Sequence, residues 1–148
     1  MTATAAPESI TVARANAPHV AVIGAGLAGL VTALRLRRAG ARVTLVTKGV
    51  GGLQLGHGTI DLLGYDPERV TNPAKGIEAF AAKHPEHPYA KIGVEAVRSG
   101  VELLSEILGE KLVNGSADEN VLVPTAVGAA RPTAFIPESM KAGVLHGD

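Results

Sequence analysis

One feature constrains the fold of this chain more than any other, a glycine hexapeptide with the sequence Gly24-Ala25-Gly26-Leu27-Ala28-Gly29. It matches the spacing G-x-G-x-x-G, and it follows the short apolar segment His19–Ile23, which predicts a buried strand. Residues 27–39 predict a helix that Gly40 ends, and residues 42–47 predict a second strand. This order predicts a βαβ unit with parallel strands and a right-handed crossover.

Each glycine of the hexapeptide has a physical task in such a unit. Gly24 permits the tight turn out of the strand, Gly26 lets a pyrophosphate approach the backbone, and Gly29 lets the helix lie close to the strand. The free N–H groups of the first helical turn then face the phosphate charge. We therefore interpret the residues of the hexapeptide as the binding loop for the ADP half of a dinucleotide, with FAD as the preferred ligand. An NAD(P)-binding unit and a glycine-rich turn that binds nothing are the alternatives.

The end of the second strand departs from the usual dinucleotide-binding pattern. An Asp or Glu that binds a ribose hydroxyl is typical there, but this chain has Thr47 followed by Lys48. The Thr47 hydroxyl can hydrogen-bond a ribose hydroxyl, although more weakly than a carboxylate can. Lys48 can lie near the adenosine ribose or the phosphates, and it can also favour the 2′-phosphate of NADP. A solvated loop charge is the alternative for Lys48.

The chain after the second strand predicts a loop followed by helices. Residues 48–64 are rich in glycine and predict a loop. Asn72 before Pro73 is a helix-start signal, and the helix is expected over Pro73–Lys83. Two prolines predict a loop over residues 84–89, and residues 94–108 follow with the pattern of an amphipathic helix, whose apolar stripe indicates core packing.

The last part of the chain predicts a turn and a β-hairpin. Asn114-Gly115 is a turn signal, and residues 121–125 and 133–136 predict two strands joined by a turn that contains glycine. We therefore expect an α/β chain of three regions. These are a flexible tail over residues 1–18, a dinucleotide-binding unit over residues 19–72, and the start of a cap or substrate region over residues 73–148.

Composition argues against several classes of function. The 148 residues include 14 basic and 14 acidic side chains, so no basic surplus indicates binding to nucleic acid. The sequence has no cysteine, which excludes disulfides and iron–sulfur ligation by this chain. The longest uncharged apolar run, residues 20–34, is shorter than the ~20 residues that a membrane-spanning helix needs. His84 and His87 are close in sequence, but Pro85 and Pro88 break any helix that would align them, and we expect no metal site.

Motifs beyond the hexapeptide point to one family. Residues 43–49 read V-T-L-V-T-K-G, and residues 56–64 read G-H-G-T-I-D-L-L-G. His87-Pro88-Tyr89 and the V-L-V-P-T-A-V-G of residues 121–128 follow. Together, residues 20–140 resemble the N-terminal portion of the B subunit of anaerobic glycerol-3-phosphate dehydrogenase. That family carries V-T-[KR]-G, G-[ST]-[IL]-D-L-L, H-P-Y and T-x-x-G motifs, and its members are much longer than this chain.

The resemblance implies a flavoprotein with a Rossmann-like, glutathione-reductase-like FAD fold. It implies a cytoplasmic heterodimer with an A subunit, held at the inner face of the cell membrane by an iron–sulfur C subunit. The implied reaction is oxidation of sn-glycerol 3-phosphate to dihydroxyacetone phosphate, with electrons passing to menaquinone and then to fumarate or nitrate. FMN is the alternative flavin, but the hexapeptide favours FAD because FMN has no pyrophosphate. A flavin-relay subunit that performs no catalysis is the alternative function.

The same resemblance implies roles for residues of the glycine-rich loop. Gly58 and Thr59 would approach the ribityl chain or the isoalloxazine ring, as would Asp61, for which a helix N-cap or a turn role is the alternative. His57 is a candidate contact of the flavin or of substrate phosphate, and a solvated loop histidine is its alternative. Arg131 is a candidate for phosphate recognition or a surface charge. The sequence identifies no catalytic base.

Overall fold

The computed structural model describes residues 16–146, which fall into two compact units divided between Gly56 and His57. Most of the predicted tail over residues 1–18 lies outside the described residues. The division comes earlier in the chain than the predicted boundary after Asn72. Residues 57–72 associate with the second unit because Ile60 pairs with Phe135 and the Asn120 side chain binds carbonyl groups in that stretch.

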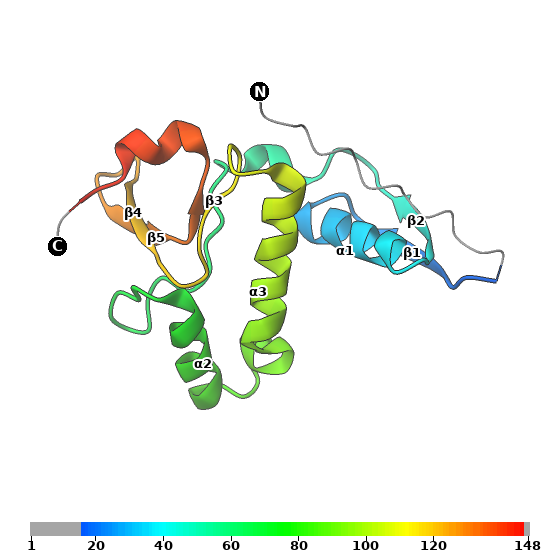
Figure 1. The fold of residues 1–148 in the computed structure, drawn as a ribbon, viewed down its shortest axis with the longest axis horizontal. Helices are drawn as coiled ribbons and strands as arrows, with labels where there is room; N and C mark the ends of the chain where they lie inside the picture. The colour runs from blue at the N-terminus through cyan, green and yellow to red at the C-terminus, as the bar shows by residue number, and fades with distance from the viewer. Residues whose placement is uncertain (1–15, 147–148) are drawn as a thin grey trace, which may run out of the picture. The chain divides into compact units, whose positions relative to one another are not determined.

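The first unit is the predicted βαβ unit, which the structure confirms (Figure 1). It contains β1 (His19–Ile23), α1 (Leu27–Arg38) and β2 (Arg42–Val46), followed by the 3-10 helix η1 (Gly52–Leu55). β1 and β2 are parallel, in a register that starts at His19 with Arg42 and ends at Ile23 with Val46. Each residue of α1 retains part of its accessible surface, so this unit has little interior.

The second unit contains the two helices α2 and α3 (Figure 1), and both begin at a proline. α2 (Pro73–Lys83) begins as predicted, and the Asn72 side chain accepts a hydrogen bond from the Lys75 N–H at 2.9 Å. α3 (Pro88–Leu108) begins within the stretch predicted as a loop. That prediction was wrong for its last two residues because proline is well suited to the first helical position, where its missing N–H needs no partner.

Gly93 interrupts α3 with a non-helical conformation, φ 76° and ψ 161°. The predicted helix over residues 94–108 therefore corresponds to the part of α3 that follows Gly93. Of the predicted apolar stripe, Val101 and Leu104 are buried, whereas Leu108 at the end of the helix is 40% exposed. The pattern thus identified the packed middle of the helix but extended the buried face too far.

The rest of the second unit contains short antiparallel strands. β4 (Val121–Pro124) and β5 (Ala130–Thr133) form the predicted hairpin, while β3 (Asn114–Gly115) pairs with β6 (Phe135–Ile136). The 3-10 helix η2 (Glu138–Gly143) follows. The second strand of the hairpin was predicted at residues 133–136, and this position was wrong because the strand is β5. β5 contains a proline, which is tolerated there because β5 is an edge strand. The predicted turn at residues 114–115 is instead β3.

The core of the second unit forms where α3 meets the β3–β6 pair. It contains Val101 of α3 and four residues from the β3–β6 region, which are Val113, Ala117, Ala134 and Phe135. The half-buried side chains of Ile60 and Leu62 pack against it. The Asn120 side chain holds residues 57–72 in place, because its amide donates hydrogen bonds to the carbonyls of Leu63 at 2.9 Å and Val70 at 2.7 Å. The segment around Ile60 is therefore part of the packed unit.

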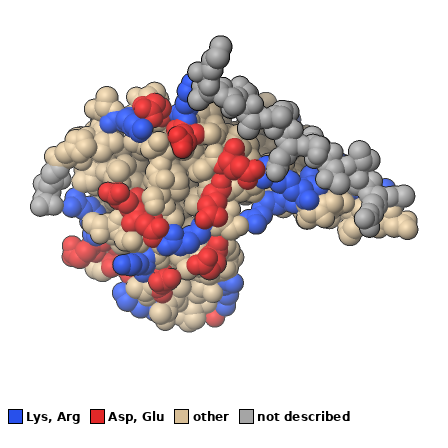
Figure 2. Space-filling view, in the orientation of Figure 1, with Lys and Arg blue, Asp and Glu red and all other residues tan. Residues whose placement is uncertain are grey.

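Charged side chains of both signs are interspersed over the second unit on the face shown in Figure 2. This mixture agrees with the equal numbers of acidic and basic residues in the sequence. Within residues 16–146, no helix combines the length and the apolar character needed to cross a lipid bilayer.

Candidate functional site

The glycine hexapeptide connects β1 to α1 at the carboxyl ends of the two parallel strands. Gly24 has a φ of +105°, and its N–H donates to the carbonyl of Val46, the last residue of β2, at 2.8 Å. Gly26 is the N-cap of α1, and its carbonyl accepts the first helical hydrogen bond from Leu30 at 3.0 Å. The chain therefore turns directly from the strand end into the helix, as a phosphate-binding turn requires.

Gly29 and Gly26 differ in what surrounds them. A β-carbon on Gly29 would lie 2.0 Å from the Gly24 carbonyl oxygen, so only glycine permits this approach of helix and turn. A β-carbon on Gly26 would have no heavy atom within 4 Å, so the backbone there is open to a ligand. The first turn of α1 is uncharged, which leaves the positive end of the helix dipole available to an anion. These features fit a diphosphate, and the binding role of the hexapeptide stays a prediction.

Gly51 also contacts the hexapeptide, and the sequence analysis did not single it out. Its φ is +73°, and a β-carbon on it would lie 2.4 Å from the carbonyl oxygen of Ala25 and 2.8 Å from the backbone nitrogen of Gly26. The loop after β2 therefore lies against the hexapeptide backbone. The adjacent glycines of residues 49–52 are the sequence signal that marks this close approach.

Thr47 follows β2, beside the start of the hexapeptide. Its hydroxyl donates to the Gly49 carbonyl and accepts from the Gly49 N–H at 3.1 Å. The hydroxyl hydrogen is thus used within this turn, and the oxygen can serve a ribose hydroxyl only as an acceptor. The Lys48 side chain is exposed. The binding roles predicted for both residues are compatible with these positions and stay predictions.

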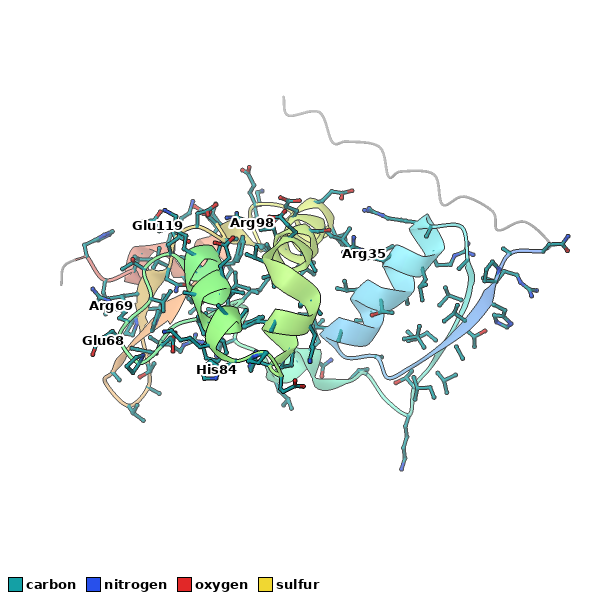
Figure 3. The ribbon with its side chains drawn as sticks, turned by 90° about the horizontal axis from the view of Figure 1, so that it is seen from below. Arg35, Glu68, Arg69, His84, Arg98 and Glu119 are labelled. Atoms are coloured by element: carbon teal, nitrogen blue, oxygen red, sulfur yellow. The ribbon has the colours of Figure 1, made fainter. Side chains whose placement is uncertain are left out.

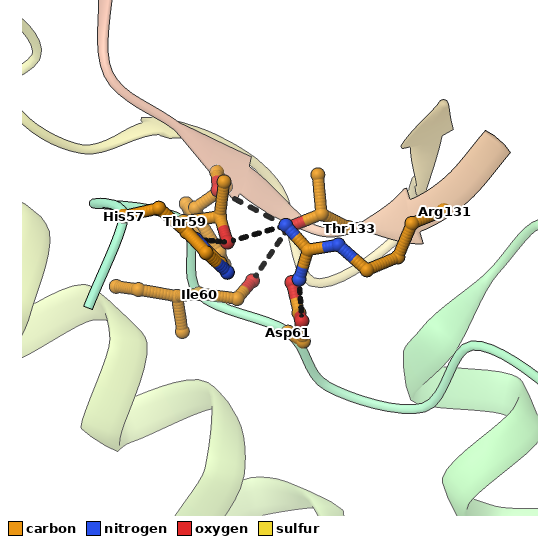
Figure 4. A network of polar contacts seen from close by, with 7 residues as sticks. His57, Thr59, Ile60, Asp61, Arg131 and Thr133 are labelled. Carbon is orange, nitrogen blue, oxygen red and sulfur yellow. Dashed lines mark hydrogen bonds and ion pairs between the residues drawn. The ribbon is translucent and has the colours of Figure 1, made fainter. Parts of the chain in front are cut away.

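Gly58 and Thr59 belong to the second unit, where Thr59 lies in a polar network (Figure 4). The Thr59 hydroxyl is 2.9 Å from Nδ1 of His57 and accepts a hydrogen bond at 3.0 Å from the Arg131 guanidinium. Arg131 also forms an ion pair with Asp61. The hairpin strand β5 therefore brings Arg131 to three residues of the glycine-rich loop, His57, Thr59 and Asp61.

The structure excludes a helix N-cap role for Asp61, while its approach to the flavin stays a prediction. In the described chain no helix begins directly after Asp61, so the N-cap alternative is wrong. Its carboxylate instead pairs with the guanidinium of Arg131, 70 residues later in the sequence. Arg131 is half-buried and paired with Asp61, and its role in phosphate recognition stays a prediction.

The H-P-Y motif at the start of α3 has a local structural role. His87 is the N-cap, and its Nδ1 accepts a hydrogen bond from the Tyr89 N–H at 3.1 Å. The rings of His84 and His87 lie 4.2 and 4.9 Å from the Phe80 ring (His84 is labelled in Figure 3). Burial raises the pKa of the Tyr89 hydroxyl.

Among the described residues, no three His, Cys, Asp or Glu side chains gather in a group able to hold a metal ion.

Comparison with known proteins supports the resemblance found in the sequence. The chain is 35% identical over 130 residues to the probable B subunit of anaerobic glycerol-3-phosphate dehydrogenase from Halobacterium salinarum, covering 88% of this chain and 30% of that protein. It is 37% identical over 134 residues to the B subunit of anaerobic glycerol-3-phosphate dehydrogenase from Yersinia enterocolitica, covering 86% of this chain and 31% of that protein. The chain thus spans less than a third of the length of these relatives. No solved structure matches it.

The match to a protein family covers nearly the whole chain. The FAD binding domain family aligns with residues 19–146, from the first residue of β1 to the end of the described chain. The alignment includes the hexapeptide, the loop that contacts it and the polar network of the second unit. It confirms the prediction of FAD as the cofactor. This chain is therefore a member of the FAD binding domain family.

Proposed function

We propose that this chain is the FAD-binding portion of the B subunit of an anaerobic glycerol-3-phosphate dehydrogenase. The observation that carries the proposal is the turn from β1 into α1, with an open backbone at Gly26 and an uncharged first helical turn. The family match and the relatives that bear the name of this subunit support it independently. The chain would contribute to oxidation of sn-glycerol 3-phosphate to dihydroxyacetone phosphate.

The chemistry of that reaction divides between cofactor and protein. Bound FAD would supply a two-electron acceptor for the hydride that the substrate loses. The chain's own residues bind the ADP half of the cofactor through backbone N–H groups at the N-terminus of α1. Thr47 would accept from a ribose hydroxyl, and Lys48 would lie near the phosphates. No acid or base role follows for these residues.

The resemblance to the B subunit of anaerobic glycerol-3-phosphate dehydrogenase also suggests an assembly with other subunits. We propose a heterodimer with an A subunit, and an iron–sulfur C subunit that holds the complex at the inner face of the cell membrane. Electrons would pass from the flavin to a quinone and then to fumarate or nitrate. The names of the relatives designate one subunit of a larger enzyme, which supports partner subunits in general.

Cofactor content tests the proposal directly. The full chain is purified and its visible spectrum recorded, and the released cofactor is then identified by mass spectrometry. We expect flavin absorption near ~450 nm and release of FAD. Gly26→Val should lose the bound FAD without change in the circular dichroism spectrum, because the valine side chain occupies the space of the diphosphate. Gly100→Ala is the matched control, since a β-carbon there also meets no atom within 4 Å.

Two results would contradict the proposal. The first is a purified chain that binds no FAD when the cofactor is added in excess. The second is equal FAD content in the Gly26→Val and Gly100→Ala variants. Release of FMN or NAD(P) in place of FAD would replace the cofactor assignment. Turnover of glycerol 3-phosphate by the complex with and without this subunit then separates a catalytic subunit from an electron relay.

A further inference from the structure

The β3–β6 pair has an open edge at Gly115, where two backbone groups have no partner among the described residues. We propose that this edge binds an extended, basic segment of a partner subunit, which adds to the pair as a further strand. That the segment belongs to another subunit rests on the proposed function, whereas the chemistry of the edge does not. The residues that form the edge all belong to the second unit.

The pairing of β3 with β6 sets the direction of the Gly115 backbone groups. Gly115 lies opposite Phe135, and the adjacent Ser116 N–H donates to the Ala134 carbonyl at 3.2 Å. Phe135 uses its own N–H and C=O to bind Ile60, on the other side of β6. Residues of an antiparallel pair alternate between those that bind each other and those whose N–H and C=O point outward. The N–H and C=O of Gly115 therefore point away from β6.

The open part of this edge is one residue long. On one side of Gly115, the Val113 N–H donates to the Gly109 carbonyl at 3.0 Å. On the other side, the Ala117 carbonyl accepts from the Ala74 N–H at 2.9 Å. The free N–H and C=O of Gly115 match the C=O and N–H of one residue in an extended peptide, because two such residues exchange both hydrogen bonds.

Two open cavities meet at this edge, and both are lined by Gly115 and Ser116. The smaller cavity, of about 340 Å³, is also lined by Phe135. The larger cavity, of about 660 Å³, is lined by Asn114 and Ile136, the next pair of the register. Successive residues of a strand point to opposite faces, so the cavities lie on opposite faces of the β3–β6 pair. An extended segment at the edge would place its side chains alternately in the two cavities.

The charges around the cavities favour a basic segment. Glu102 lines the smaller cavity, and Glu110 and Glu119 line the larger one (Glu119 is labelled in Figure 3). In the described chain none of these three carboxylates has an ion-pair partner. Arg98 and Lys141, which also line the cavities, each form an ion pair with another carboxylate. Lys and Arg side chains would complement this edge, and their aliphatic stems would cover its apolar walls.

A synthetic peptide tests the edge on the full chain labelled with ¹⁵N. The probe is Ac-Val-Lys-Arg-Lys-Val-NH2, which carries cations on both faces when extended. We expect a Kd below about 1 mM, a shift of the Gly115 amide resonance and slower exchange of that amide with deuterium. The acidic peptide Ac-Val-Glu-Glu-Glu-Val-NH2 should produce none of these changes at the same concentration.

The hydrogen bonds are tested by changing the peptide, because Gly115 cannot be substituted. A β-carbon on Gly115 would lie 2.0 Å from the Ala134 carbonyl oxygen. N-methylation of the central Arg of the peptide removes the donor to the Gly115 carbonyl and should weaken binding at least about tenfold. N-methylation of the Lys that follows is the matched control, because its N–H points away from the edge. Its Kd should stay within about threefold of the parent peptide.

The charge complementarity is tested in the chain. Glu119→Lys should weaken binding of the basic peptide at least about fivefold, because it places a cation in the larger cavity. Glu86→Lys is the matched control, because it changes the net charge equally at an exposed position that lines neither cavity. Circular dichroism checks that both variants are folded.

Several results would overturn the inference. They are no binding of the basic peptide at about 1 mM, an unmoved Gly115 amide, equal binding of the two methylated peptides, or equal effects of Glu119→Lys and Glu86→Lys. Protection of the Gly115 amide that rises with the concentration of the chain alone would assign the edge to a second copy instead. Failure of the proposed function gives a different result, because a chain that binds the peptide but no FAD refutes the FAD-binding role alone.

Discussion

The guanidinium group of Arg98 on α3 holds both carboxylate oxygens of Asp118, with distances of 2.6 and 2.8 Å (Arg98 is labelled in Figure 3). The two residues lie 20 positions apart, so the pair ties α3 to the chain between β3 and β4. The hydrogen bond to Arg98 lowers the pKa of Asp118, and the same bond raises the pKa of Arg98. The pair therefore links the stability of the second unit to pH.

Acid should weaken the second unit through Asp118. Because the pKa of Asp118 is lower in the folded chain than the ~3.9 of an unfolded aspartate, its contribution is complete above that value and is lost as the pH falls through the folded pKa. Asp118→Asn should flatten this dependence in denaturant unfolding measured between about pH 5 and pH 2. The control is Glu86→Gln, whose ion pair with Lys91 is largely exposed. Equal curves for Asp118→Asn and the wild type would contradict the link.

Gly29→Ala should destabilise the first unit. The added β-carbon would lie 2.0 Å from the Gly24 carbonyl oxygen, a backbone atom that cannot move without opening the turn. Overpacking of this kind costs about 1–3 kcal/mol, and thermal unfolding followed by circular dichroism measures it. Gly26→Ala is the comparison, because its β-carbon meets open space. Similar stability losses in both variants would show that helix and turn are not in close contact.

Gly51→Ala should lower FAD affinity. The residue has a φ of +73°, and its β-carbon would lie 2.4 Å from the Ala25 carbonyl oxygen, so the hexapeptide must shift to make room. We expect a loss of about tenfold, or about 1.4 kcal/mol, in a titration followed by flavin fluorescence. Gly52→Ala is the adjacent control, since nothing lies within 4 Å of its β-carbon. Unchanged affinity in Gly51→Ala would separate this loop from the binding turn.

Asn120→Asp should destabilise the second unit more than Asn120→Ala does. The side-chain amide donates to two carbonyl groups, those of Leu63 and Val70, and a carboxylate would place negative charge against both. The expected loss in urea unfolding is at least about 2 kcal/mol for Asp, because buried charges without donors are costly. Asn114→Asp, the same substitution in β3, is the control. A stable Asn120→Asp variant would mean that these two hydrogen bonds contribute little.

The first unit could be predicted from local signals. A short apolar strand, a glycine turn and a helix followed by Gly40 lie next to one another in the chain, so each boundary has its own signal in the sequence. Gly40 follows α1 with a φ of +85°, as expected of a residue after a helix. The positions of Thr47 and Lys48 followed from the end of the second strand.

The polar network of the second unit could not be predicted in the same way. Arg131 meets Thr59 and Asp61 because β5 leads directly into β6, where Phe135 pairs with Ile60, and no local pattern encodes pairing over 70 residues. The proline within β5 obscured the second hairpin strand, and a proline at the first helical position obscured the start of α3. Tertiary packing decided the polar network and the strand pairing, whereas the start of α3 follows a local preference of proline that the two prolines of this stretch had concealed.

The sparse interior of the first unit has a dynamic consequence. Each residue of α1 keeps part of its accessible surface, and Val22 is the buried residue of β1. Segments with few buried apolar contacts open at low free energy, so the amide protons of β1 and β2 should exchange with deuterium before those in the middle of α3. A nucleotide bound at the N-terminus of α1 would slow that exchange by mass action. Cofactor loading would then determine how long this part of the chain survives a protease.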